Sequence, residues 1–144
     1  MPEQQTVERA REDAREGKSP STQAGEFGRE EIHHVREGKH GARSPQQAIA
    51  IGLSKARRAG IKLSPPRGKK AVRIKAAQDE RASKEHRQPS KTRSRATEGA
   101  LRHESRKSAN SKALSQQAER AAASRGKKAR RQAAEKAART RKAA

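Results

Sequence analysis

The chain has 144 residues, with 37 Lys or Arg against 16 Asp or Glu and a formal net charge of +21. Only 28% of its residues are hydrophobic, with one Phe and with no Tyr, Trp or Cys. Without Cys it has neither disulfides nor cysteine-ligated zinc, and so little apolar surface argues against a large catalytic pocket. We therefore expect no enzyme activity, no cofactor and no small-molecule substrate.

The charge divides the sequence into three zones. Residues 1–31 have a net charge of −3, residues 32–78 a net charge of +11, and residues 79–144 a net charge of +13. Low hydrophobicity with high net charge is typical of chains that do not bury enough surface to fold fully. We expect an all-α and mostly non-globular protein, in which a small αα-hairpin carries a helix-prone or disordered basic tail.

The acidic zone predicts a first helix over residues 3–16, which Gly17 would end. This segment has almost no apolar face, because Val7 stands alone among polar residues. We expect residues 1–25 to form a poorly ordered or helical acidic arm. The arm is either solvated or folded back on the basic zones, where it would compete with nucleic acid.

The next two helices are predicted over residues 26–37 and 45–59, and they form the hairpin module of residues 26–66. Gly38 and Gly41 would end the first helix, and Ser44, Pro45 and Gln47 supply an N-cap, a first helical residue and a capping box for the second. Gly60 would end the second helix. About eight large side chains make up this core, so it should be marginally stable alone.

The second predicted helix carries a narrow apolar stripe and a strip of small residues. Together they predict an interaction face at which a second copy or a protein partner would dock. Its residues are Ile49, Gly52, Leu53 and Ala56.

Residues 67–144 are predicted to form a basic, helix-prone or disordered tail. Helical segments are expected over 71–87, 111–126 and 127–144. The last segment is rich in Ala, which favours a helix, and dense in like charge, which opposes it. Such a segment is typically disordered when free and helical once its charge is neutralised.

The basic excess predicts a polyanionic partner. The tail offers no rigid frame for reading bases, and the single Phe provides no stacking platform, so phosphate contacts along duplex DNA are favoured over single strands. The Gly-rich residues 38–44 precede a helix N-terminus and are expected to contact phosphate, although they lack the nucleotide-binding P-loop pattern. The candidate nucleic-acid-binding residues are Lys39, Arg43, Lys55, Arg57, Arg58, Lys62, Lys69, Lys70, Arg73, Lys127, Lys128, Arg130 and Arg131.

Three histidines, His33, His34 and His40, raise the question of a metal site. Adjacent histidines point to different sides of a helix, and we find neither Cys nor a suitably spaced carboxylate to complete a site. We therefore predict no metal ligand and no catalytic residue.

The segment "EIHHVREGKHGARSPQQAIAIGLSKARRAGIKLSPP", residues 31–66, resembles a family of small, very basic bacterial proteins of uncharacterised function. Some of its members are labelled DNA-binding or plasmid-stabilisation proteins. Residues 98–125 and the basic ending are similar to that family too, and the Lys/Ala-rich tail resembles histone H1-like bacterial proteins. The resemblance implies a bacterial origin and favours DNA, but it supplies no mechanism and no catalytic residues.

The hypothesis that follows is a nucleoid-associated, histone-like protein that binds duplex DNA without sequence specificity. We expect it in the cytoplasm, because no apolar run would span a membrane and the N-terminus lacks the features of a signal peptide. Two alternatives remain open: a protein-interaction or oligomerisation module with a basic anchor tail, and an RNA- or ribosome-associated protein.

Overall fold

A computed structural model describes residues 1–143, and every regular element in them is helical. The expectation of an all-α chain is confirmed. The α-helices and one short 3-10 helix (η1) are, in chain order, α1 (Gln4–Arg15), α2 (Pro20–Glu37), α3 (Pro45–Arg58), α4 (Lys70–Lys84), α5 (Lys91–Arg102), η1 (Arg106–Ala109), α6 (Ser111–Ser124) and α7 (Gly126–Ala143).

Local signals explain where the helices of the hairpin begin and end. The Ser44 hydroxyl accepts a hydrogen bond from the Gln47 amide at 3.2 Å, and Pro45 opens α3. The Gln47 side chain accepts from the backbone amide of Arg43, one residue before the position that a standard capping box would use. Gly38 ends α2 with a φ of 77°, a left-handed conformation that glycine adopts without a steric penalty.

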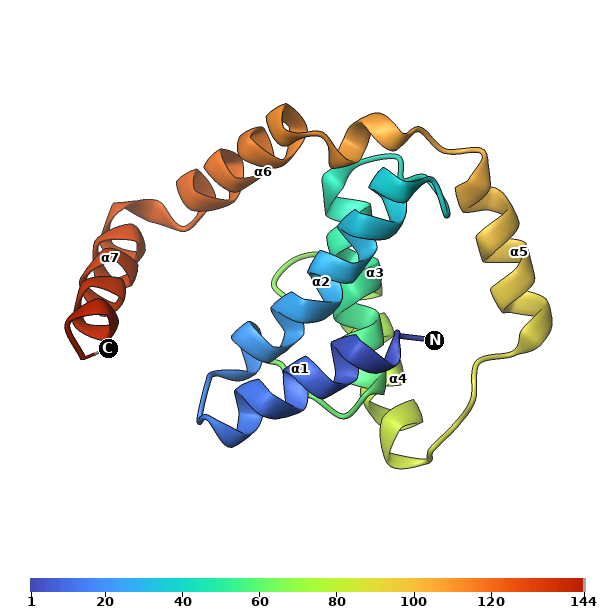
Figure 1. The fold of residues 1–144 in the computed structure, drawn as a ribbon, viewed down its shortest axis with the longest axis horizontal. Coiled ribbons are helices and arrows are strands. Elements are labelled where there is room, and N and C mark those ends of the chain that lie inside the picture. The colour runs from blue at the N-terminus through green and yellow to red at the C-terminus, as the bar shows by residue number, and fades with distance from the viewer. Residues whose placement is uncertain (144) are drawn as a thin grey trace. The chain divides into compact units, whose positions relative to one another are not determined.

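Residues 1–109 form one compact unit in which four helices pack in sequence. The helix α1 contacts α2, α2 contacts α3, and α3 contacts α4, as Figure 1 shows from blue to yellow-green. The packed part of the chain is therefore larger than the two-helix hairpin expected from the sequence. This packing does not agree with the expectation of a mostly non-globular protein, because α1 and α4 cover the hairpin.

The apolar core of this unit consists of two small clusters. Phe27 is fully buried in the first cluster, where Ala and partly buried Leu or Ile side chains from α1, α3 and the segment after α3 surround it. Val35 is fully buried in the second, against Ala42, Ala48 and Ala109. Most of these residues are alanines, so the core depends on a close approach between helices rather than on large side chains.

The helices α2 and α3 approach each other closely at Gly52. A Cβ atom built on Gly52 would lie 2.8 Å from the backbone of Gly28 and 2.8 Å from the carbonyl oxygen of Phe27. Such distances leave no room for a side chain. Gly52 is therefore a packing requirement of the α2–α3 pair.

A distant segment, residues 101–109, docks on the loop between α2 and α3. The amide of Gly41 donates to the Leu101 carbonyl at 2.8 Å, and the amide of Ala42 donates to the Ser105 carbonyl at 3.1 Å. The Arg36 guanidinium donates to the carbonyl of Ala109 at 2.9 Å. These contacts fix the loop of residues 38–44, although α5 itself has no buried residue.

Residues 110–143 belong to a second unit, which consists of α6 and α7. Asn110 caps α6 by accepting the Ala113 amide at 2.7 Å, and the two helices contact each other. Neither helix has a buried residue. The helical segments expected at 111–126 and 127–144 are thus present as far as residue 143, while Ala144 lies outside the described residues.

Candidate functional site

Three of the candidate phosphate-binding residues on α3 point toward carboxylates of the protein itself. The clearest case is Lys55, whose Nζ lies 2.9 Å from Glu30 Oε1 and also contacts Glu31 Oε1. Both glutamates are buried in α2. Burial opposes the charge on Lys55, but the hydrogen bonds from its ammonium to Glu31 and Glu30 prevail and raise its pKa.

The neighbouring Arg58 is bound to a buried aspartate of α4. Its Nε lies 2.9 Å from Asp79 Oδ1, while Ser54 donates to Asp79 Oδ2 at 2.6 Å and Lys75 donates to Oδ1 at 2.5 Å. Burial alone would raise the pKa of Asp79, but the hydrogen bonds from Lys75 and Ser54 outweigh it and keep that pKa below its usual value. This group of residues joins α3 to α4.

Arg57 is also directed inward and is only 7% exposed. Its guanidinium donates to the Ser64 carbonyl at 3.5 Å and lies 3.8 Å from a carboxylate oxygen of Glu80. The sequence predicts that Lys55, Arg57 and Arg58 contact nucleic acid. The structure places these three cations in contacts that connect α3 to α2, to α4 and to the segment after α3.

The two candidate cations of the loop before α3, Lys39 and Arg43, lie at the surface. Lys39 is half-exposed, with its Nζ 2.9 Å from Glu3 and 3.2 Å from Glu37. Hydrogen bonds to Glu3 and Glu37 raise the pKa of this lysine. Arg43 is exposed and has no ion-pair partner within residues 1–143.

Five exposed cations follow one another along the chain between residues 62 and 73, in the segment that leads into α4 and in its first turn. In the part of the chain that the structure describes, none of them has an ion-pair partner, so their charge faces solvent. The group consists of Lys62, Lys69, Lys70 and Arg73 from the candidate set, with Arg67 beside them.

The second unit carries the densest unpaired charge. Residues 110–143 contain eleven Lys or Arg and two Glu, a net charge of +9. Lys127, Lys128 and Arg130 are exposed without a carboxylate partner among the described residues, and Arg131 has one exposed contact, 3.0 Å from Glu135. An exposed pair of this kind holds its partners weakly, so Arg131 remains accessible to an anion.

The predicted interaction face is largely occupied inside the chain. Gly52 and Ala56 are buried, with Gly52 against the backbone of α2, and Leu53 packs on the Phe27 cluster. Ile49 is partly buried. The small residues that were predicted to admit a partner helix admit α2 instead.

Sequence reasoning missed a cluster of possible metal ligands at the end of α2. Glu31, His34 and His40 each place one ligand atom within 4.8 Å of the others. The prediction that no suitably spaced carboxylate is present was therefore wrong, because Glu31 lies three residues before His34 on the same helix face. The E-x-x-H spacing was the available signal, and the position of His40 was not predictable from it.

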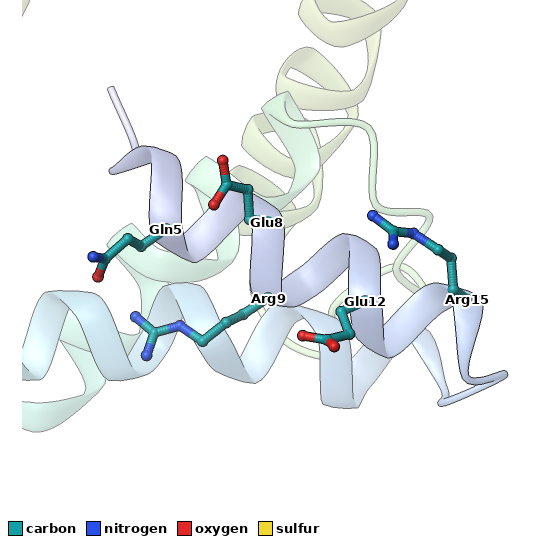
Figure 2. Close-up of a pocket in the computed structure, with 5 residues that line it drawn as sticks. All are labelled: Gln5, Glu8, Arg9, Glu12 and Arg15. Atoms are coloured by element: carbon teal, nitrogen blue, oxygen red, sulfur yellow. The ribbon is translucent and has the colours of Figure 1, made fainter.

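A hollow of about 440 Å³ lies along α1, and every residue that lines it has a polar or charged side chain. Figure 2 shows the five side chains around it, all from α1: Gln5, Glu8, Arg9, Glu12 and Arg15. Binding sites for small molecules are lined mostly by hydrophobic and aromatic side chains, and none of the residues that line this hollow is of that kind.

Comparison of the chain with protein-family models, with curated proteins and with solved structures finds no match. The resemblance of residues 31–66 to small basic bacterial proteins therefore stays a prediction. Within residues 1–143, no helix combines the length and the apolar character needed to cross a membrane.

Proposed function

We propose that the protein binds duplex nucleic acid, with duplex DNA preferred, by neutralising backbone phosphates without reading base sequence. In this proposal it is a bacterial, nucleoid-associated and histone-like protein of the cytoplasm. The observation that carries the proposal is the exposed charge of residues 110–143, in which eleven cations accompany two glutamates. Cations without internal partners are the ones that release counterions when they approach phosphates.

The arrangement of charge on α7 suits phosphate contacts better than base contacts. Successive residues of an α-helix are 100° apart, so Lys127, Lys128, Arg130 and Arg131 spread over an arc of about 160°, close to half the circumference of α7. Base reading needs side chains fixed against one groove edge, whereas phosphates line both sides of a groove.

Like charges three or four residues apart also destabilise α7, because Lys127 lies one turn from both Arg130 and Arg131. Phosphates would remove this repulsion. We therefore propose that the tail is helix-prone or disordered when free and becomes fully helical on nucleic acid.

A second phosphate-binding surface is assigned to the exposed cations near the start of α4. Lys62, Lys69, Lys70 and Arg73 are free to contact an anion without breaking an internal ion pair. By contrast, Lys55, Arg57 and Arg58 would have to give up buried carboxylates or a backbone carbonyl. We assign these three residues to the fold and not to phosphate.

The experiment is a salt series with a random-sequence DNA duplex and the full-length protein. The logarithm of the binding constant falls with the logarithm of salt concentration by about 0.9 for each phosphate contact. Replacing Lys127 and Lys128 with Gln should therefore reduce that slope by about 1.8 if both residues contact phosphate.

The matched control removes the same charge elsewhere. Arg11 and Arg15 are exposed on α1 and have no ion pair among the described residues, so an R11Q/R15Q variant has the same net charge as K127Q/K128Q. Its slope should stay close to that of the native protein. An equal reduction of the salt slope in the two variants would mean that binding depends only on total charge, and would contradict the assignment to α7.

Competition between duplex DNA and a structured RNA of equal length separates the main proposal from RNA binding. A-form RNA is recognised by shape and phosphate contacts, so the cations of α7 alone do not exclude it. Stronger competition by RNA than by DNA would replace the DNA proposal with an RNA-associated function.

A further inference from the structure

The cluster of Glu31, His34 and His40 lies at the junction of α2 and the loop that follows it. Glu31 is 1% exposed, and the two histidine side chains are 11% and 12% exposed. His40 Nε2 is 3.3 Å from Glu31 Oε2, and His34 Nδ1 is 3.7 Å from Glu31 Oε1. One ligand atom from each of the three residues therefore lies within 4.8 Å of the other two, in a mostly buried place.

In each imidazole ring, one nitrogen faces Glu31 and the other, here called the outer nitrogen, faces away from it. Each outer nitrogen has a partner that can only accept a hydrogen bond. His34 Nε2 lies 2.9 Å from Glu3 Oε1, and His40 Nδ1 lies 2.9 Å from the backbone carbonyl oxygen of Gly41. A carboxylate and a carbonyl accept, so both outer nitrogens must carry the proton. In a neutral ring, the nitrogen that faces Glu31 then carries a lone pair.

Two lone pairs facing a carboxylate repel unless a positive charge lies between them. The Lys55 ammonium beside Glu31 Oε1 supplies part of that charge, and a metal ion between the rings would supply the rest. Histidines that bind metal usually donate their second N–H to a carboxylate or a backbone carbonyl, and both kinds of partner are present here. This orientation of two rings is a second observation, independent of the short distances within the cluster.

We propose that Glu31, His34 and His40 form a binding site for one divalent transition-metal ion of the zinc class. Two imidazole nitrogens and one carboxylate oxygen suit Zn²⁺ and its neighbours, whereas Mg²⁺ and Ca²⁺ prefer oxygen ligands alone. The ligand nitrogens are Nδ1 of His34 and Nε2 of His40, because the outer nitrogens are committed elsewhere. The remaining coordination positions are left to water.

The backbone of α2 and of the loop after it holds the three ligand residues close together. Glu31 and His34 lie one helical turn apart on α2, and His40 follows the left-handed Gly38 that ends the helix. The hydrogen bond from Gly41 to Leu101 then fixes the backbone beside His40. A bound ion would therefore connect α2 to the loop before α3 and would stabilise the folded unit, because unfolding separates the ligands.

Lys55 is the internal competitor for the same carboxylate. Its ammonium contacts Glu31 Oε1, while Oε2 faces His40. Because Lys55 also contacts Glu30 Oε1 at 2.9 Å, it keeps a carboxylate partner when the ion engages Glu31.

The experiment uses the full-length protein, treated with chelator and then titrated with Zn²⁺ by calorimetry, with Mg²⁺ as a control ion. We expect one equivalent of Zn²⁺ to bind and Mg²⁺ not to bind at the same concentrations. H34A and H40A should each weaken Zn²⁺ binding by at least the roughly 10- to 100-fold typical of changes around a metal site. H33A is the matched control, since His33 is the exposed neighbour of His34 and lies outside the cluster.

A second measurement uses the native protein and leaves the loop unaltered. Long-range ¹H–¹⁵N NMR of the native protein reports the state of each imidazole nitrogen. Zinc should shift Nδ1 of His34 and Nε2 of His40, and should leave His33 unchanged. The proposal is overturned if no Zn²⁺ binds, if H33A weakens binding as much as H40A, or if both rings stay doubly protonated with Zn²⁺ present.

Discussion

Gly52 allows the sharpest test of the packing between α2 and α3. In a helix, replacing Gly with Ala normally stabilises the folded state, since Gly is about 0.8–1.0 kcal/mol less favourable than Ala. At Gly52 the new methyl group would lie 2.8 Å from the backbone of Gly28 and from the Phe27 carbonyl oxygen. Backbone atoms do not rotate away as a side chain does, so the two helices must separate.

The magnitude follows from two opposing effects. Overpacking a core costs about 1–3 kcal/mol, and contact with backbone on three atoms places G52A toward the upper end of that range. Subtracting the helix-propensity gain of about 1 kcal/mol leaves a net destabilisation of about 1–2 kcal/mol. Each kcal/mol lowers the Tm of a domain of this size by about 4–8 °C.

Gly25 provides the matched control on α2. A Cβ atom built there meets nothing within 4 Å, so G25A should stabilise the protein by about 0.5–1 kcal/mol. Urea unfolding followed by far-UV circular dichroism measures both variants, and it suits a chain that has neither Trp nor Tyr. If G52A is as stable as G25A, the close α2–α3 contact is refuted.

Two further variants test contacts that sequence reasoning did not anticipate. Replacing Asp79 with Asn should destabilise the protein by about 1.5–3 kcal/mol, the range for hydrogen bonds to charged groups, because Arg58 and Lys75 lose their anionic partner. The pKa of Asp79 is depressed in the folded state, so its stabilisation is fully present above its usual pKa and is lost as acid titrates the folded carboxyl. The acid-side fall of the urea midpoint should accordingly be shallower in D79N, and an unchanged profile would contradict this account. Replacing Gly41 with Ala would bring a Cβ atom to 1.9 Å from the Glu104 carbonyl oxygen, so residues 101–109 should leave the loop and be cleaved faster in limited proteolysis. G99A is the control, because nothing lies within 4 Å of that position, and equal cleavage of the two variants would refute the docking.

The helices of this chain were predictable because the signals that bound them are local. Ser44 and Pro45 start α3, and Gly38 ends α2, where the sequence indicated. The start of α2 was missed by six residues, since the cap at Ser19 was not considered and α2 begins at Pro20. The helix α5 was not predicted, because its segment has neither an apolar face nor a side-chain cap.

The partners of the charged residues were not predictable, because they lie far apart in the sequence. Lys55 meets Glu30 across 25 residues, and Arg58 meets Asp79 across 21. Composition does not distinguish one cation of the basic zones from another. The packing of α2 and α4 on α3 determines which of them form internal ion pairs and which stay exposed. The same limit applies to the candidate metal site, where the E-x-x-H pair is local and the approach of His40 depends on the loop.

The acidic residues of this basic protein lie where they determine which cations remain free. The carboxylates of Glu30, Glu31 and Asp79 are buried, and they neutralise cations that tie α3 to its neighbours. Within residues 1–143, Glu135 is the one carboxylate that contacts a cation of α7, and it is exposed. The salt dependence of nucleic-acid binding should therefore follow the exposed, unpaired cations and fall well short of what a net charge of +21 suggests.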